Sequence, residues 1–348
     1  MIPIFDGHND FLQRMVDAGP NRDQLWLKGD GHGHLDLPRM QAGGMAGGFF
    51  AIWTPMQDGD IGGNWMEMMA EPPFSVPLPR PIDAPEALPG ALAQAANLLA
   101  MERTGTLSIC RSVADIRDAM AANRIAAILH IEGAEPIADL DALHVWHAIG
   151  LRSLGPVWSR STRYAHGVPF AFPSSPDTGD GLTDAGRDLI RECNSLKIMV
   201  DLSHLNEKGF WDVARLSDAP LVASHSNAHA ICPSSRNLTD DQLAAIRNSG
   251  GLVGLNYAVN FLVPNGSRHP FEGFAPMLHQ LDHLLNALGE DGVALGSDYD
   301  GATMPADLSD ASKLQELIAA MLPHYGEALT RKIAHENWLN LLARTWGQ

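Results

Sequence analysis

Apolar runs bounded by glycine, proline or polar residues recur along the whole chain and predict buried strands. Most of these runs contain β-branched or aromatic residues, which favour extended backbone. We expect eight strands, over Ile2–Phe5, Gly48–Trp53, Ile125–Ile131, Leu151–Val157, Ile198–Leu202, Pro220–Ser224, Leu252–Asn256 and Val293–Gly296.

Amphipathic stretches between these runs predict helices. PEALPGALAQAANLLAMERTG over 85–105 is one such stretch, and ENWLNLLARTW over 336–346 closes the chain. LTDAGRDLIRECNSL over 182–196 has Thr183 as its expected N-cap. TDDQLAAIRNSG has Thr239 as its expected N-cap and Gly250 as its stop signal.

The alternation of strand and helix predicts an α/β fold, a (β/α)8 barrel of the TIM type. The alternative is a doubly wound open sheet, but no GxGxxG or GxxxxGK[ST] motif follows an expected strand. We predict one barrel domain over residues 1–348, with insertions near 57–88 and 159–181. Both insertions leave the C-terminal ends of strands, where barrel enzymes hold their sites.

The net charge of the chain narrows the classes of partner that it is expected to bind. Lys and Arg total 24 against 41 Asp and Glu, a net charge of −17 that disfavours binding to nucleic acid and to anionic membranes. The cysteines Cys110, Cys193 and Cys232 form no CxxC motif, so neither a disulfide framework nor a thiolate metal site is expected. No signal-peptide pattern and no bilayer-length apolar run is present, so we expect a cytoplasmic protein.

Polar side chains stand at the C-terminal ends of five expected strands. Barrel closure brings such ends together at one mouth, where these residues would meet. They are His8 and Asp10, Glu132, His204, His225 and Asp298.

Neutral imidazole and carboxylate are zinc ligands, and two neighbouring metal ions need an anionic bridge. We therefore expect two zinc ions per chain. His8, Asp10 and Glu132 hold one ion, and Glu132, His204 and His225 hold the other. Asp298 remains as a proton carrier.

Other histidines are expected to be structural. The motif GHGH over 31–34 lies on no strand end, and His130 is expected to be a satisfied interior residue or a partner of a ligand. Four more fall in helical stretches, namely His144, His147, His279 and His283.

Several of these stretches together resemble the membrane (renal-type) dipeptidase family of binuclear zinc peptidases, in particular its bacterial members. The resemblance covers nearly the whole chain, in order, through FDGHND, HLDLPRMQAGGMAGGFFAIWTP, the IEG turn, VDLSH, SHSNAHAICPSSRNLTDDQL and GSDYDG. It implies a (β/α)8 barrel related to the amidohydrolases. It also implies hydrolysis of dipeptides, often with a D-residue at the C-terminal position, and in some members the opening of β-lactams.

The resemblance implies the same division of metal ligands and adds Arg236 as the residue that receives the terminal carboxylate of the substrate. A guanidinium suits this task because it binds a carboxylate through two hydrogen bonds. The alternative is a salt bridge from Arg236 to Asp240 or Asp241.

The fourth strand departs from the family. Members often place a histidine at its end, where it helps to polarise the scissile carbonyl, but this chain has Trp158. Indole donates one hydrogen bond and carries no proton. Either His166 in the following insertion reaches back, or a metal ion alone polarises the carbonyl. Tyr257, like Trp158, is expected either to contact substrate or to pack.

The function that follows is hydrolysis of a small peptide, a dipeptide, by a hydroxide held between two zinc ions. Asp298 accepts its proton and passes it to the leaving amine, although Asp298 as a metal ligand and Asp300 as the proton carrier are alternatives. A related amidohydrolase acting on N-acyl amino acids or lactams is one rival, and a non-catalytic ligand-binding barrel is another. A homodimer is an open expectation.

Overall fold

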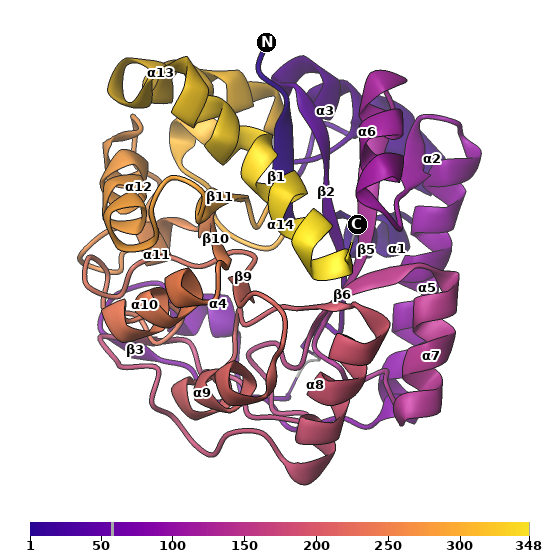
Figure 1. Ribbon diagram of the computed structural model, residues 1–348, viewed down its shortest axis with the longest axis vertical. Coiled ribbons are helices and arrows are strands. Elements are labelled where there is room, and N and C mark those ends of the chain that lie inside the picture. Colours follow the sequence, from indigo (N-terminus) through magenta and orange to yellow (C-terminus); the bar gives the residue numbers. More distant parts are fainter. Residues whose placement is uncertain (57–58, 348) are drawn as a thin grey trace.

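The computed structural model describes residues 1–56 and 59–347 (Figure 1). The start of the first predicted insertion, at 57 and 58, lies outside the described residues, as does the last residue of the predicted domain.

Parallel strands form the centre of the molecule. Five of them pair in the order β1-β2-β5-β6-β8, and three more pair in the order β11-β10-β9. Their bounds are β1 (Ile4–Asn9), β2 (Met45–Trp53), β5 (Ile125–Glu132), β6 (Leu151–Gly155), β8 (Met199–Val200), β9 (Val222–Ala223), β10 (Leu252–Asn256) and β11 (Val293–Gly296).

Two single bridges join these sheets into a closed barrel. Asp201 after β8 pairs in parallel with Val222 of β9, and Asn9 of β1 pairs in parallel with Tyr299 after β11. The second joint is reinforced because Asp298 donates its backbone N–H to the carbonyl of His8 over 3.0 Å. The barrel prediction is confirmed, and so is the place of every expected strand.

Helices surround the barrel (Figure 1). In the described part of the chain they are α1 (Phe11–Ala18), α2 (Arg22–Lys28), α3 (Leu37–Gly43), α4 (Trp65–Met68), α5 (Ala84–Arg103), α6 (Val113–Ala121), α7 (Leu140–Ile149), α8 (Asp184–Leu196), α9 (Glu207–Leu216), α10 (Asp240–Asn248), α11 (Val259–Leu262), α12 (Ala275–Leu288), α13 (Leu314–Arg331) and α14 (Asn337–Trp346). Short turns of tighter or wider helix are η1 (Gly19–Asn21), η2 (Ala306–Leu308), η3 (Ala311–Lys313) and η4 (Lys332–Glu336).

The predicted N-caps are present. The Thr183 hydroxyl accepts the backbone N–H of Gly186 at the start of α8. Thr239 and Gln242 form a reciprocal capping box at the start of α10. The helix ends at Asn248, just before Gly250, whose φ of 69° lies in the left-handed region that glycine adopts without strain.

Three short strands were not predicted. β4 (Leu107–Ile109) pairs with the first half of β5, on the edge that β6 occupies further along. β3 (Phe74–Ser75) and β7 (Ala171–Phe172) pair antiparallel, and each lies in one of the two predicted insertions. The insertions therefore form one cover rather than two independent loops.

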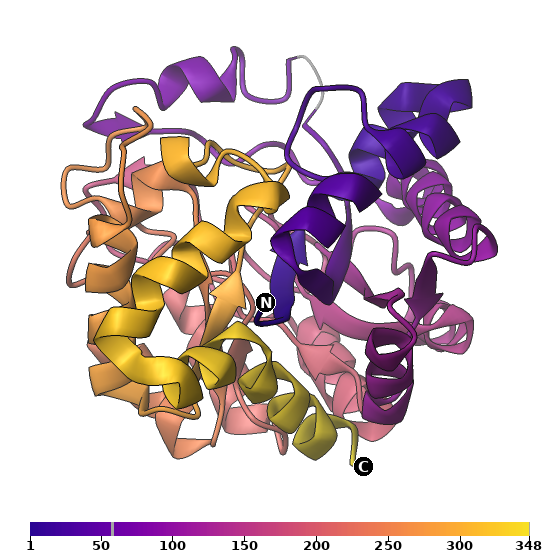
Figure 2. The same ribbon diagram turned by 90° about the horizontal axis from the view of Figure 1, so that it is seen from above.

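The barrel has two differently covered ends. Figure 2 shows the first insertion, with α4 and β3, over the end toward which β1 and β11 point, while α14 lies at the opposite end. The interior near α14 is filled by a cluster that includes Phe5, Phe49, Ile128, Leu252 and Trp338. The polar strand ends face the insertion.

Candidate metal centre and substrate cavity

The strand ends bring the five predicted metal ligands into one buried group. His8 and Asp10 follow from β1, Glu132 ends β5, and the two remaining histidines stand after β8 and β9. Each side chain is at most 6% exposed. Three triads among the described residues have ligand atoms within 4.8 Å of one another, and two of them are the predicted ones: His8, Asp10 and Glu132, and Glu132, His204 and His225.

Glu132 lies between the two triads. Its Oε2 is 3.6 Å from His8 Nε2, while its Oε1 is 3.1 Å from His204 Nε2 and 3.3 Å from His225 Nε2. On the first side, His8 Nε2 is 3.5 Å from Asp10 Oδ1. One carboxylate therefore directs one oxygen to each half of the group, which is the arrangement a bridging ligand needs.

Serine hydroxyls orient the two histidines that follow β8 and β9. Ser159 Oγ is 2.9 Å from His204 Nδ1, and Ser224 Oγ is 2.8 Å from His225 Nδ1. Each bond occupies Nδ1 and turns Nε2 toward Glu132. Such outer partners fix the ring orientation of metal-binding histidines.

Burial sets the protonation of these groups. It lowers the pKa of His8 to about 4, and it holds the pKa values of His204 and His225 well below the usual range, helped by the Arg236 charge. The imidazoles are therefore neutral near pH 7 and keep a lone pair for a metal. Burial, reinforced by Asp10 and Asp298, raises the pKa of Glu132, so a cation would relieve the repulsion among these carboxylates.

Unpaired buried atoms in this group also indicate a site for metal ions. Among the described residues, both ring nitrogens of His8, Oδ1 of Asp10 and Oε1 of Glu132 are buried without a hydrogen bond of acceptable geometry. Buried polar atoms are normally paired, and an exception needs a partner such as an ion. The donor set of imidazole and carboxylate is the one zinc prefers.

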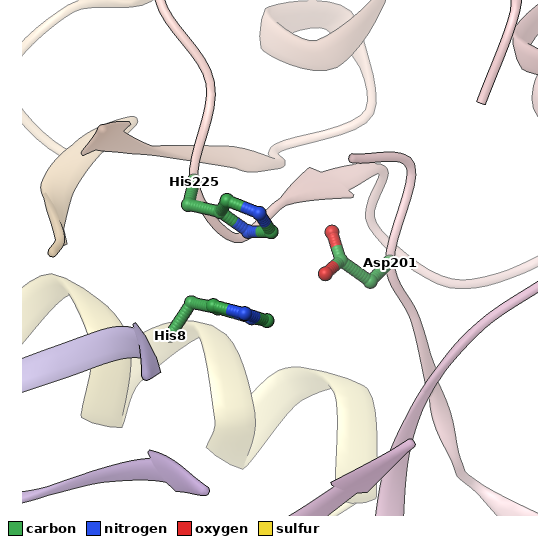
Figure 3. A group of neighbouring side chains, drawn as sticks. All are labelled: His8, Asp201 and His225. Carbon is green, nitrogen blue, oxygen red and sulfur yellow. The ribbon is translucent and has the colours of Figure 1, made fainter. Parts of the chain in front are cut away.

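Asp201 forms a third close group with His8 and His225. Figure 3 shows the two rings lying one above the other, with centroids 3.8 Å apart, and the carboxylate directed toward both. Its oxygens are already used, however. Oδ1 accepts the backbone N–H groups of Ser224 (2.8 Å) and Ser203 (3.1 Å), and Oδ2 accepts the Ser224 hydroxyl. Asp201 therefore braces the strand ends, whereas Asp10 and Glu132 keep free oxygens.

Asp298 lies beside the metal group. Its Oδ2 accepts a hydrogen bond of 2.9 Å from Asn256 Nδ2, and its side chain lines the same cavity as Asp10 and Glu132. Burial, reinforced by Asp10, raises the pKa of Asp298 above its ordinary value. Its φ of 61° is sparsely populated for a non-glycine residue, as expected where the chain is held for function.

Asp300 is bound elsewhere. It accepts the backbone N–H of His34 (2.7 Å) and a guanidinium N–H of Arg14 (3.2 Å), and it donates its own N–H to His34 Nδ1. These bonds tie the GHGH loop to the chain after β11. The loop is structural, as expected, and Asp300 faces it rather than the cavity.

Arg236 is buried next to the metal group. Its Nη1 donates to Ser226 Oγ (2.8 Å) and its Nη2 to the His225 carbonyl (2.9 Å), while Nε has no hydrogen bond among the described residues. Among the described residues Arg236 makes no salt bridge to Asp240 or Asp241, and Asp240 pairs with His283.

A cavity opens from the metal group toward the insertions. Its polar floor includes Asp10, Glu132, His204 and Asp298. Its apolar walls are Trp53, Trp65, Met69, Trp158, Phe170 and Phe261. Trp158 lies 5.3 Å from Trp53 and 6.0 Å from His204, ring centre to ring centre. Trp158 thus faces the cavity at the place predicted for a substrate contact.

Three of the four predicted substrate contacts do not line this cavity, and Arg236, buried beside the metal group, is one of them. His166 lies beside Gly179 in the second insertion, with Nδ1 3.4 Å from Ser161 Oγ. Tyr257 is 1% exposed, packs edge-on against Tyr299 and belongs to the main apolar cluster.

Sequence reasoning missed three polar residues of the cavity, namely Asn260, Arg268 and Thr303. Arg268 donates to the Met66 carbonyl of α4 (2.8 Å) and to Thr303 Oγ1 (2.9 Å). Asn260 and Arg268 lie in a segment without a motif, and only its placement after the barrel strand β10 pointed to the cavity. Thr303 lies after β11, two residues beyond the recognised stretch GSDYDG.

Two of the other histidines have protein partners. His130 Nδ1 is 2.8 Å from Ser153 Oγ, although its Nε2 is buried without a hydrogen bond among the described residues, and His144 pairs on the surface with Glu192. In the described residues, no helix is both long enough and apolar enough to cross a bilayer.

Comparison with known proteins places this geometry in a family. The family model for membrane dipeptidase, peptidase family M19, matches residues 1–346. The crystal structure of a metallopeptidase from Rhodobacter sphaeroides, liganded with a phosphinate mimic of the dipeptide L-Ala-D-Ala, is 59% identical with a TM-score of 0.96 and covers 99% of both chains. The structure of dipeptidase AC, an M19 metallopeptidase, is also 59% identical with a TM-score of 0.96, over 100% of this chain and 99% of that one.

A relative found by its sequence is similar to this chain, but its description states no activity. An uncharacterized Klebsiella pneumoniae protein encoded in the pqqA 5' region is 46% identical over 246 residues, which is 70% of this chain and 91% of that protein.

Proposed function

The chain belongs to the membrane dipeptidase family, peptidase family M19, and from that premise we propose that it is a zinc-dependent dipeptidase. The observation that carries the proposal is the position of Glu132, whose two oxygens face His8 on one side and His204 and His225 on the other. A similar protein from Rhodobacter sphaeroides binds a mimic of L-Ala-D-Ala, which supports a dipeptide as substrate.

His8, Asp10 and Glu132 would hold one zinc ion, and Glu132, His204 and His225 the other. When bound, the ions supply Lewis-acid polarisation of a carbonyl and a water of lowered pKa. The family implies a metal, and the unpaired buried nitrogens and oxygens of these residues support two ions.

Asp298 handles the proton in this proposal. It lies on the cavity floor, where Asn256 donates to its Oδ2, and its Oδ1 accepts no hydrogen bond from the described part of the chain. A carboxylate in this place accepts the proton of the attacking water and returns it to the amine nitrogen that leaves the peptide bond. Burial raises the pKa of Asp298, which strengthens it as a base.

Arg236 anchors the terminal carboxylate of the dipeptide. Its free Nε and its burial beside the metal group favour a charged acceptor, since an isolated guanidinium in this environment is costly. Arg268 places a second cation on the cavity wall. Together they offset the repulsion that a protein of net charge −17 exerts on an anionic substrate.

Metal analysis combined with a substrate panel tests the proposal. We expect about two zinc ions per chain, and hydrolysis of Xaa-D-Ala and Xaa-L-Ala dipeptides that a chelator abolishes and added zinc restores. Turnover of N-acyl amino acids or lactams in preference to dipeptides would favour the related amidohydrolase. Two bound ions without hydrolysis of any of these compounds would favour a binding protein.

A further inference from the structure

The substrate cavity contains two N–H groups that nothing in the described protein uses. Trp53 Nε1 and Asn260 Nδ2 are both buried, both residues line the cavity, and neither nitrogen has a hydrogen-bond partner in the described part of the chain. Asn260 is only 3% exposed, so bulk water does not satisfy it. Leaving a buried donor unpaired costs free energy, unless a ligand supplies the acceptor.

The backbone carbonyl of Asn260 accepts the Cys232 thiol, but its side-chain Nδ2 donates to nothing in the described part of the chain. Asn260 belongs to α11, whose carbonyl groups are held by the amides of neighbouring segments. Asn227 and Asn237 donate to the Phe261 carbonyl over 3.2 and 3.0 Å, and Gln280 donates to the Leu262 carbonyl over 3.2 Å. These three amides anchor the helix, and the carboxamide of Asn260 is left facing the cavity.

Trp53 is held firmly while its indole N–H stays free. Gln94 clamps its backbone, accepting its N–H over 3.1 Å and donating to its carbonyl over 2.7 Å. By contrast, the indole N–H groups of Trp26 and Trp338 each have a partner at 2.9 Å, Thr106 Oγ1 and the Leu295 carbonyl respectively.

The positions of the two donors indicate which substrate atoms they meet. Trp53 is the register partner of Glu132 on the neighbouring strand, so both side chains leave the same face of the sheet toward the metal group. Asn260 adjoins Phe261, to which Asn237 ties the segment that carries Arg236. Trp53 therefore lies toward the reacting carbonyl, and Asn260 toward the carboxylate end.

We propose that Trp53 and Asn260 are substrate-binding residues: the Trp53 indole N–H donates to the scissile carbonyl oxygen, and the Asn260 amide donates to the terminal carboxylate of the dipeptide. The proposal rests on the dipeptidase function inferred above. It also gives the chain a neutral donor near the carbonyl, where its fourth strand carries Trp158 in place of the histidine that is frequent in the family.

Trp53→Phe and Asn260→Leu remove the donors while keeping similar shapes. The thermal midpoints of both variants are expected to equal or exceed that of the wild type, because an unpaired buried group is lost. Trp53→Phe lowers kcat about tenfold or more, since its bond strengthens as charge develops on the carbonyl oxygen. Asn260→Leu raises KM about tenfold to 100-fold, as expected for a lost bond to a charged acceptor.

Matched controls remove donors that do have partners. Trp26→Phe breaks the bond to Thr106, and Asn97→Leu breaks bonds to Arg22 and to the Leu12 carbonyl. Both control variants should lower the thermal midpoint and leave kcat and KM within about twofold of the wild type. The cavity variants should instead change kcat or KM without lowering the thermal midpoint. This contrast distinguishes a role in substrate binding from a structural role.

A dipeptide amide identifies the oxygen that Asn260 binds. Blocking the carboxylate should remove most of the difference between Asn260→Leu and the wild type. Asn260→Asp should raise KM for the free dipeptide further than Leu does, because like charges then meet. Unchanged kcat and KM in both cavity variants, or an equal Asn260→Leu effect on dipeptide and amide, overturns the assignment.

Calorimetric binding of a phosphinate dipeptide mimic separates this inference from the proposed function. If the wild type binds the mimic without hydrolysing dipeptides, the function fails, while weaker binding by Asn260→Leu, about tenfold or more, still upholds the contact. If the wild type neither hydrolyses dipeptides nor binds the mimic, both proposals are wrong.

Discussion

The two ends of the barrel use the same strands for opposite purposes. At the end covered by α14, Phe5 and Phe49 meet edge to face, and Phe49 lies 4.9 Å from Trp338. The Trp338 indole there donates to the Leu295 carbonyl over 2.9 Å, although Asn337 Oδ1 and Thr345 Oγ1 of α14 are buried without a hydrogen bond among the described residues. At the other end, three residues further along β1, His8 has two buried nitrogens without hydrogen bonds.

The α14 end therefore contributes mainly to the stability of the fold, and the mouth contributes mainly to function, although the same strands form both ends. Close-packed apolar groups favour the folded state, whereas unpaired buried polar groups oppose it until a metal or substrate arrives. Substitutions at the α14 end should therefore act on unfolding. Substitutions at the mouth should act on catalysis, metal affinity and pH response, in the order given below.

Asp298→Asn should cause the largest change. Asparagine has a similar shape and its amide oxygen can accept the hydrogen bond from Asn256, but it cannot take up a proton. We therefore expect kcat to fall about 10²- to 10⁴-fold with metal content unchanged. Steady-state kinetics and metal analysis of the same samples measure both effects. Loss of metal in step with activity would make Asp298 a ligand instead. Asp300→Asn is the matched control, with lower stability and nearly unchanged kcat.

Trp338→Ala should destabilise the fold by about 3–5 kcal/mol, because it empties a fully buried site against Phe49 and removes the bond to Leu295. Urea unfolding gives the free energy, and kcat below the transition should stay near that of the wild type. Trp211→Ala, on the partly buried face of α9, should cost much less. A similar cost for both variants would contradict the special role of the α14 end.

Glu135→Gln should change the pH dependence of stability by about 2 kcal/mol between pH 5 and pH 8. Burial raises the pKa of Glu135 to about 7 from an ordinary 4.5, although Arg160 lies 3.7 Å away and opposes the shift. Between these values the folded state binds more protons than the unfolded chain. The free energy of unfolding of the wild type therefore falls as pH rises through this window.

The neutral glutamine removes that slope, so the variant should gain stability relative to the wild type as pH rises. Chemical denaturation at several pH values measures it. Parallel stability curves for both proteins would show that Glu135 does not hold a proton in the folded state.

Ser159→Ala should weaken zinc binding about tenfold, the smallest of these effects, because His204 loses the bond of 2.9 Å that fixes its ring. Competition with a chelator gives the affinity. Ser153→Ala removes an equally short bond to His130, which is outside the proposed ligand set, and should leave zinc affinity unchanged. Equal losses in the two variants would mean that His130 also acts on the metals.

The strand ends were the part of the site that the sequence could predict. The last residues of parallel strands lie at the mouth of a barrel. The sequence alone therefore placed His8, Asp10 and Glu132 at one end of the barrel. The apolar runs likewise marked each barrel strand, because buried parallel strands are continuously hydrophobic.

Contacts between distant segments could not be predicted in this way. The pairing of Phe74 with Phe172 involves two residues from each insertion, too few to leave a periodic pattern. Nothing in the sequence around Asn260 shows that its neighbours already satisfy the helix backbone. Asp201 lies in the recognised stretch VDLSH, yet only its hydrogen bonds show that its oxygens are occupied.

The bridge between Asn9 and Tyr299 has a consequence for biosynthesis. A ribosome makes Asn9 about 290 residues before Tyr299, so this edge of β1 stays unpaired until the segment after β11 has been synthesised. The His8 carbonyl is held by the Asp298 backbone N–H, so the position of His8 is fixed only when that segment has been made. We therefore expect a chain truncated before β11 to bind zinc more weakly than the full chain, although it contains all five proposed ligands.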